Sequence, residues 1–213
     1  MNKLFYYDEM MKVLDSLANK NPKPKLLLHS CCGPCNTYPM ELLTNYFELT
    51  LFFNNSNIYP SEEYQRRLNE LLRYIDYFNE KHNTSIKCVI TPYEGENFTK
   101  YLEIFKDEPE GGKRCELCFI KRLDEAYKYA SENNFDYFTT VMTVSRNKNS
   151  KTLNEIGIKL ANKYPNTKYL ITDLKKKDGT LKGIKIANEL NMYRQDYCGC
   201  LFSKENLKKR ENI

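Results

Sequence analysis

The sequence has no tryptophan and only two histidines among its 213 residues. It also lacks any apolar run approaching the ~20 residues that cross a bilayer, and its N-terminal segment meets Asp8 and Glu9 where a secretory signal would be apolar. Neither a G-x-x-x-x-G-K-S/T loop nor a G-x-G-x-x-G motif occurs, so no standard phosphate-binding signature supports a nucleotide cofactor. We therefore expect a cytoplasmic protein without a membrane partner, whose chemistry rests little on histidine.

Length and composition are those of a folded globular protein. Hydrophobic residues make up 41% and charged residues 29% of the chain, so we predict a single domain over residues 1–213. The net charge of +5 comes from 33 basic and 28 acidic residues. This mildly basic balance permits contact with nucleic acid but does not require it.

Cysteine is what the chain has in excess, and the stretch Lys25–Cys35 (KLLLHSCCGPC) organises the rest. Its apolar run Leu26–Leu28 is bounded by prolines, which predicts a buried strand of a parallel sheet. Three thiols, Cys31, Cys32 and Cys35, follow where that strand stops. Because ligands bind at the carboxyl ends of strands in open α/β sheets, we expect a site here.

The remaining chain alternates between strand and helix patterns. Strands are predicted at 26–28, 48–53, 85–90, 135–144 and 168–171, and helices at 8–19, 38–46, 97–106, 115–133, 152–163, 183–190 and 203–210, with one long helix whose N-cap would be Ser61. This alternation predicts an α/β fold, with a parallel sheet covered on both faces by helices.

Two further thiol pairs occur far along the chain, Cys115 with Cys118 and Cys198 with Cys200. Seven of the eight cysteines therefore lie in three tight groups, and one soft metal or a metal cluster is the simplest explanation for gathering them. Cys88 stands alone in a predicted strand, so we interpret it as a small buried hydrophobe outside the site.

Three chemistries fit such cysteines. A structural zinc site would use four thiolates, but the adjacent Cys31 and Cys32 are poorly spaced for zinc. A thiol–disulfide oxidoreductase would need only Cys115 and Cys118. An iron–sulfur cluster takes about four thiolates and leaves others free, so we favour it. His29 is interpreted as a hydrogen-bonded residue within its strand.

Five segments, in order from about residue 25 to residue 202, carry a family resemblance: LLLHSCCGPC, FFNNSNIYP, KRCELCFIKRL, FTTVMTVSRNKN and MYRQDYCGC. Together they resemble the QueH-type epoxyqueuosine reductases, iron–sulfur enzymes that work without cobalamin. The resemblance implies reduction of epoxyqueuosine to queuosine at the wobble base of tRNA, supported by an external, ferredoxin-like electron donor. It also implies a Rossmann-like fold similar to the adenine-nucleotide α-hydrolases.

The resemblance further implies a 4Fe–4S cluster held by Cys31, Cys32, Cys115 and Cys118. The family's counterpart of Cys198 and Cys200 is either a redox-active disulfide or part of a second iron site, in which Cys35 would share. Cys35 stands where some relatives have an aspartate, and a thiolate can replace a carboxylate as an iron ligand.

Substrate contacts are expected from the residues that precede the last thiol pair, namely Arg194, Gln195 and Tyr197. Arg194 would contact a phosphate and Gln195 a base edge. Two other functions stay open on the sequence. One is an ATP-dependent tRNA-modifying enzyme with Ser145–Lys148 as a degenerate phosphate loop. The other is a zinc-stapled nucleic-acid-binding module without catalysis.

Overall fold

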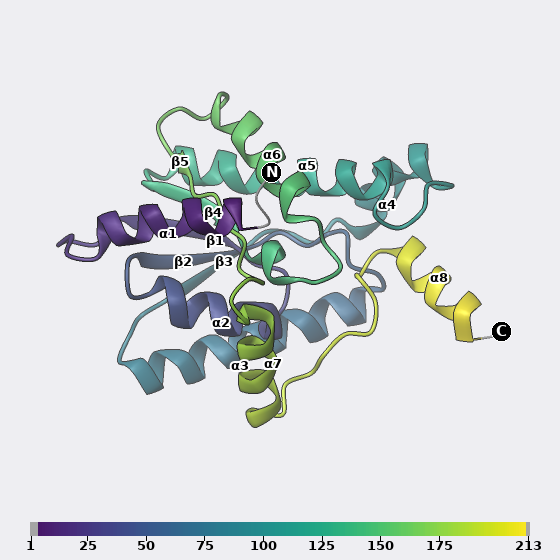
Figure 1. The fold of residues 1–213 in the computed structure, drawn as a ribbon. Coiled ribbons are helices and arrows are strands. Elements are labelled where there is room, and N and C mark those ends of the chain that lie inside the picture. The colour runs from purple at the N-terminus through teal and green to yellow at the C-terminus, as the bar shows by residue number, and fades with distance from the viewer. Residues whose placement is uncertain (1–3, 212–213) are drawn as a thin grey trace.

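A five-stranded parallel sheet forms the centre of the computed structural model, which describes residues 4–211 (Figure 1). The strands are β1 (Lys25–His29), β2 (Glu48–Phe53), β3 (Lys87–Ile90), β4 (Tyr137–Thr140) and β5 (Lys168–Tyr169). Their order is β3-β2-β1-β4-β5, so the chain builds outward from β1 on one side and then crosses to the other. This topology confirms the predicted α/β class and puts the switch point between β1 and β4, where ligands of such sheets bind.

Helices cover both faces of the sheet (Figure 1). They are α1 (Phe5–Leu17), α2 (Gly33–Leu43), α3 (Ser61–His82), α4 (Gly95–Leu102), α5 (Lys113–Glu132), α6 (Ser150–Ala161), α7 (Gly179–Glu189) and α8 (Leu201–Glu211), with short 3-10 helices η1 (Glu103–Phe105) and η2 (Val141–Val144). Helices α2, α3 and α7 lie on one face and α5 and α6 on the other, while α8 extends away from the sheet. Within residues 4–211, none of the helices combines the length and apolarity needed to cross a membrane.

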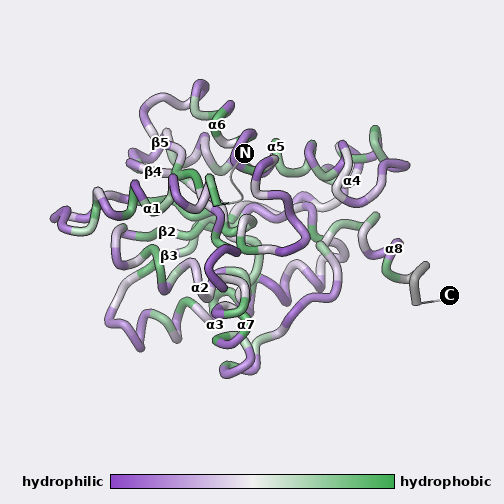
Figure 2. Tube along the Cα trace, in the orientation of Figure 1, coloured by the Kyte–Doolittle hydropathy of each residue, from purple (hydrophilic) through white to green (hydrophobic). Residues whose placement is uncertain are grey.

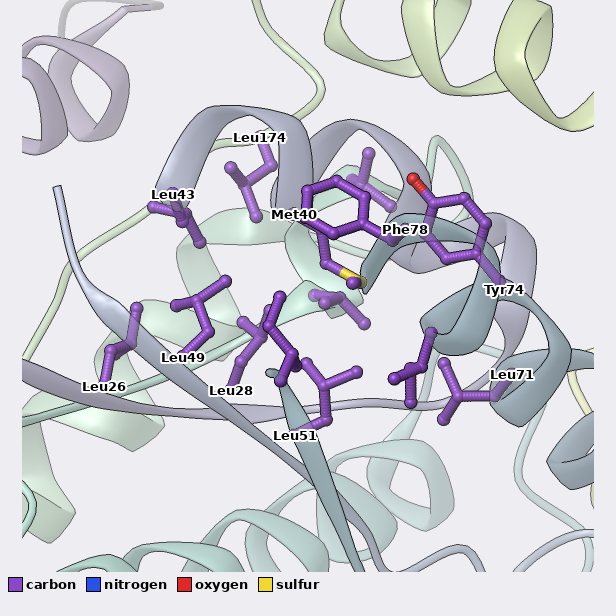
Figure 3. Close-up of a cluster of buried hydrophobic side chains, with 14 of the residues drawn as sticks. Leu26, Leu28, Met40, Leu43, Leu49, Leu51, Leu71, Tyr74, Phe78 and Leu174 are labelled. Carbon is purple, nitrogen blue, oxygen red and sulfur yellow. The ribbon is translucent and has the colours of Figure 1, made fainter. Parts of the chain in front are cut away.

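The alternating side chains of β1 join two cores. Leu26 and Leu28 pack with α2 and α3 (Figure 3). Leu27 packs with α5 and α6 on the opposite face. All three leucines are fully buried, and each such burial stabilises the fold by roughly 1.5–3 kcal/mol. Figure 2 shows hydrophobic residues gathered in the central strands, whereas along the helices hydrophilic and hydrophobic residues alternate.

The structure differs from the sequence prediction at several boundaries that bear on the site. Helix α2 begins at Gly33, directly after Cys32, and not at residue 38. Pro34 lies in its first turn, where the missing N–H costs nothing. The predicted strand 135–144 ends at Thr140, because the Thr140 hydroxyl accepts a hydrogen bond from the Met142 N–H and the chain turns into η2.

Two further boundaries were misjudged. The N-cap of α3 is Pro60, and Ser61 is already the first helical residue. Helix α7 begins at Gly179, four residues before its predicted start at 183. An added Cβ at Gly179 would lie 1.9 Å from the Leu174 carbonyl oxygen, so only glycine fits this entry to the helix.

Candidate metal centre

The cysteine turn joins the end of β1 to the start of α2 and is fixed by buried polar side chains. Asn36 donates from Nδ2 to the carbonyl oxygen of Cys32 at 2.7 Å, and its Oδ1 accepts from the Ser30 hydroxyl at 2.9 Å. Asn55, after β2, donates to the carbonyl oxygen of Ser30 at 2.8 Å. The side chains of Asn36 and Asn55 are fully buried, so the turn has little freedom.

This turn brings the sulfur atoms of Cys31, Cys32 and Cys35 within 4.8 Å of one another, close enough to share a metal ion. Cys32 and Cys35 are paired as a disulfide. A cysteine binds a metal as its thiolate, so metal binding by Cys32 or Cys35 requires that this disulfide be reduced. Gln195 approaches the same sulfurs, with its Nε2 3.2 Å from Cys32 Sγ and 3.9 Å from Cys35 Sγ.

The other four clustered thiols form a second group. Cys115 and Cys118 lie in the first two turns of α5, and the negative charges of Cys115, Cys198 and Cys200 each act to raise the pKa of Cys118. Burial is the largest cause and raises the pKa of Cys118 to about 12 and that of Cys200 to about 11. These thiols need a neighbouring positive charge to act as thiolates, and a bound metal supplies one.

Backbone donors face two of these sulfurs. The Gly111 N–H donates to Cys115 Sγ at 3.2 Å, and the Ser203 N–H donates to Cys200 Sγ at 3.4 Å. The Ser203 hydroxyl also accepts from the Cys198 N–H at 3.1 Å, which ties the start of α8 to the thiol loop. Hydrogen bonds to sulfur stabilise the anionic thiolate form that metals require.

The structure thus brings three of the seven thiols within 4.8 Å of one another, and the other four influence one another through their charges. Cys35 lies with Cys31 and Cys32. Its predicted share in a second iron site with Cys198 and Cys200 stays a prediction. The predicted cluster ligands come from both groups, Cys31 and Cys32 from the first and Cys115 and Cys118 from the second. That ligand set stays a prediction.

A buried arginine is linked to the cysteine turn through Asn55 and acts through its charge on Cys118. Arg122 of α5 donates from Nη2 to His29 Nε2 at 3.2 Å and also to Asn55 Oδ1. Since His29 Nε2 accepts, its Nδ1 carries the proton and donates to the Thr140 hydroxyl at 2.7 Å. Burial, helped by the Arg122 charge, lowers the pKa of His29 well below its usual value, so the imidazole is neutral. The hydrogen-bonded interpretation of His29 is confirmed.

The charge of Arg122 suits an anionic partner. Only 3% of the residue is exposed, and no carboxylate pairs with it among residues 4–211. Its Nε is buried without a hydrogen-bond partner, and its charge acts to lower the pKa of Cys118. A buried, unpaired cation beside soft thiol ligands fits a metal–thiolate group that carries net negative charge.

A second buried arginine, Arg67 of α3, holds the last thiol pair. It pairs with Glu63 at 2.6 Å and donates to the carbonyl oxygens of Cys198 at 3.0 Å and Tyr197 at 3.2 Å. Gly199 takes a φ of +134°, and an added Cβ there would lie 3.0 Å from Arg67 Nη1. The sequence analysis missed Arg67. The sequence did indicate a buried Arg67, because it lies next to Leu68 on the apolar face of a helix and has Glu63 four residues earlier as an ion-pair partner.

Two cavities open beside the thiols. One of about 360 Å³ is lined by Cys115, Cys198 and Tyr197, and one of about 310 Å³ is lined by Cys35 and Arg194. Gln195, Ser145 and Asn147 line both, so the cavities adjoin. The three residues predicted to contact substrate thus all border space next to the cysteines. Another hollow, of about 560 Å³ beside α4 and α5, contains none of the clustered thiols and is not assigned to the site.

Thiol groups at the carboxyl edge of a parallel sheet, together with a buried cation whose charge acts on one of them, define a candidate metal- and redox-dependent α/β enzyme. A family model described as "Epoxyqueuosine reductase QueH" matches residues 26–206. The chain belongs to the QueH epoxyqueuosine reductase family and is an oxidoreductase.

Relatives with the same name match this chain over most of their length. The chain is 40% identical over 205 residues to epoxyqueuosine reductase QueH of Staphylococcus epidermidis, covering 95% of this chain and 86% of the relative. Identity to the Streptococcus pyogenes protein of that name is 37%, covering 95% and 79%. The Thermotoga maritima protein is 31% identical, covering 87% and 92%. The predicted family membership is confirmed.

Proposed function

We propose that this protein removes the epoxide oxygen of epoxyqueuosine at the wobble position of tRNA and so yields queuosine, the last step of queuosine biosynthesis. The observation that carries the proposal is the family match over residues 26–206, a span that contains all three cysteine groups. The reaction consumes two electrons and two protons, converts the epoxide to an alkene and releases water. An external, ferredoxin-like donor is proposed to supply the electrons.

The proposed cofactor is a 4Fe–4S cluster held by Cys31, Cys32, Cys115 and Cys118. Such a cluster supplies electrons one at a time. The donor set suits it, because thiolates are the soft ligands that iron–sulfur clusters take, and the buried charge of Arg122, which acts on Cys118, opposes that of a cluster. The disulfide between Cys32 and Cys35 has to be reduced before Cys32 can serve as a ligand.

Because the cluster transfers single electrons, the second electron must be stored or relayed. Cys198 and Cys200 can do this as a dithiol: oxidation to a disulfide releases the two electrons and two protons that the deoxygenation consumes. The alternative is an additional mononuclear iron held by Cys35, Cys198 and Cys200. Arg67 keeps this loop in place in either case, through its bonds to the Cys198 and Tyr197 carbonyls.

Substrate binding is proposed for Arg194, Gln195 and Tyr197. Gln195 directs its Nε2 toward the Cys32 sulfur, which leaves its Oε1 free to accept a hydrogen bond from a base. Arg194 is exposed at the rim of its cavity, where a guanidinium can pair with a phosphate. The Tyr197 hydroxyl is used within the protein, since it donates to the Tyr59 carbonyl, so its ring face is the part available to a base.

The test is anaerobic purification, followed by iron and sulfide analysis and a nucleoside assay on tRNA that carries epoxyqueuosine. The expected result is a coloured protein whose visible absorbance is lost on oxidation and which converts epoxyqueuosine to queuosine with a chemical reductant. Colourless protein with stoichiometric zinc and no conversion would contradict the proposal. ATP turnover without conversion would instead support an ATP-dependent tRNA-modifying enzyme.

A further inference from the structure

A further hollow, of about 550 Å³, lies next to the two cavities and is rich in basic residues. Five cations line it: Arg146, Lys148, Lys151, Lys175 and Lys176. Among the residues that the structure describes, Asp173 is the only acidic one along it. We refer to this hollow as the basic groove.

Asp173 does not neutralise the basic groove. Its side chain is buried, accepts a hydrogen bond from the Ser150 hydroxyl at 2.7 Å and lies 4.0 Å from Lys175 Nζ, so Lys175 alone balances its charge. Lys151 has an exposed partner, Glu155, at 3.8 Å, which contributes little. Arg146, Lys148 and Lys176 pair with no carboxylate in the part of the chain that the structure describes.

The loop between the basic groove and the thiols is held in a defined position. Lys175 donates from Nζ to the carbonyl oxygens of Ser145 at 3.2 Å and Lys148 at 2.7 Å. Lys148 lines both the basic groove and the cavity with Cys115 and Cys198. Arg146 lines both the basic groove and the cavity with Cys35 and Arg194. A polyanionic chain bound in the basic groove could therefore continue directly into the two cavities.

We propose that the basic groove binds the sugar–phosphate backbone of the RNA strand whose modified base enters the cavities beside the thiols. This assignment rests on the proposed function. Cationic side chains spread along an open hollow, with Arg146 and Lys151 exposed and Lys148 and Lys176 half-exposed, suit successive phosphates of a single strand. A nucleotide triphosphate would instead call for backbone N–H groups in a glycine-rich cradle, and the 145–149 loop (SRNKN) contains no glycine.

The test compares two triple variants of equal charge in binding a fluorescent anticodon stem–loop RNA across a range of salt concentrations. The groove variant is Arg146→Ala/Lys151→Ala/Lys176→Ala, three cations that line the basic groove. The control is Lys20→Ala/Lys25→Ala/Lys87→Ala, which replaces three exposed lysines. Lys25 and Lys87 begin β1 and β3, so they lie at the edge of the sheet opposite the thiols. Both lower the net charge from +5 by three.

The groove variant should bind about ten-fold or more weakly at low salt, and its plot of log Kd against log salt should flatten by about two. The control should stay within about two-fold of the wild type. Equal losses in both variants, or an unchanged salt slope in the groove variant, would overturn the proposal. So would ATP binding that the groove variant abolishes while RNA binding is unaffected.

This assay involves no turnover, so it separates the two proposals. If the wild type fails to reduce epoxyqueuosine but the groove variant alone loses RNA binding, the basic groove stands and the proposed reaction falls. If the wild type reduces epoxyqueuosine and the groove variant binds RNA as the wild type does, the assignment of the basic groove falls alone.

Discussion

Arg67 donates from Nη1 to the carbonyl oxygen of Cys198 at 3.0 Å, across 131 residues of sequence. The same guanidinium pairs with Glu63 at 2.6 Å, and Glu63 in turn accepts from the Tyr193 hydroxyl at 2.9 Å. Only 3% of the Arg67 side chain and 10% of the Glu63 side chain are exposed. A single buried ion pair therefore connects α3 to the loop that carries the last two thiols.

Replacing Arg67 with Gln should lower the free energy of unfolding by about 3 kcal/mol, because Glu63 would be left buried without its partner. Urea denaturation measures this loss. The matched control is Arg73→Gln on the same helix, whose side chain is 51% exposed and pairs with Glu70, and it should cost less than about 1 kcal/mol. Equal effects of the two substitutions would show that Arg67 does not hold the loop.

Replacing any one of Cys31, Cys32, Cys115 and Cys118 with Ala should remove iron and sulfide from protein purified without oxygen, since a cluster needs about four thiolates. Cys88→Ala is the control. This thiol is partly buried in strand β3, outside the three groups, so its loss should leave the iron content unchanged. A variant lacking all four predicted ligands that still holds its full iron content would refute the ligand set.

Replacing Gln195 with Leu should make the reduction potential of the bound cluster more negative. Gln195 Nε2 lies 3.2 Å from Cys32 Sγ, and a hydrogen bond to a ligand sulfur stabilises the reduced, more negative state. A redox titration followed by visible absorbance measures the shift. Gln65→Leu, which removes only an exposed hydrogen bond to Asn69, should leave the potential unchanged. A Gln195 variant with the wild-type potential would argue that Cys32 is not a ligand.

The neutral His29 should make the protein less stable in mild acid. Its pKa in the folded state is lowered below the ordinary value of about 6.5, so the unfolded chain binds the extra proton first. Stability is therefore present above that pH and is lost as the pH falls. Between pH 6.5 and pH 5.5 the loss should be about 1 kcal/mol.

His29→Gln keeps an acceptor for Arg122 and a donor for Thr140 but cannot be protonated, so it should abolish this part of the pH dependence. His82→Gln, at the end of α3, should retain it. Denaturant unfolding at the two pH values, on proteins of equal iron content, gives the comparison. If His29→Gln and the wild type lose the same stability, the titrating group lies elsewhere.

The fold could be predicted where local patterns decide structure. The apolar run Glu48–Phe53 forms β2 with the predicted bounds, because it is short, apolar and ends in a polar loop. The run Val141–Val144 is equally apolar, but it forms η2 because the Thr140 hydroxyl captures the Met142 N–H. Whether the Met142 N–H bonds to the Thr140 side chain or to a neighbouring strand depends on the tertiary structure, so the sequence pattern alone could not predict this strand end.

The sequence predicted which types of residue make up the candidate site better than it predicted how they are arranged in space. Cysteine spacing and the position of Cys31 at a strand end predicted a metal centre here, and the order of motifs predicted the family, which is confirmed. The grouping of Cys35 with Cys31 depends on α2 starting at Gly33, which the Gly-Pro pair obscured. Arg122 was missed because burial of an arginine follows from contacts with distant residues such as His29.

The role of the last thiol pair can be decided by comparing Cys35→Ala with Cys200→Ser. A dithiol needs only Cys198 and Cys200, whereas a second iron site should also depend on Cys35. The structure places Cys35 next to Cys31 and Cys32, so Cys35→Ala also tests whether Cys35 belongs to that first group instead. Iron content and conversion of epoxyqueuosine tRNA are measured for both variants.

If a second iron is present, Cys35→Ala should lose one iron and all turnover while the absorbance of the cluster is retained. If the pair is a redox disulfide, Cys35→Ala should stay active, and Cys200→Ser should be inactive with its iron content unchanged, because a serine hydroxyl cannot form the disulfide that stores two electrons. Loss of the whole cluster in Cys35→Ala would instead make Cys35 a cluster ligand, as its distance from Cys31 and Cys32 allows. Full activity of both variants would show that electrons reach the epoxide without either thiol, and the proposed two-electron relay would be wrong.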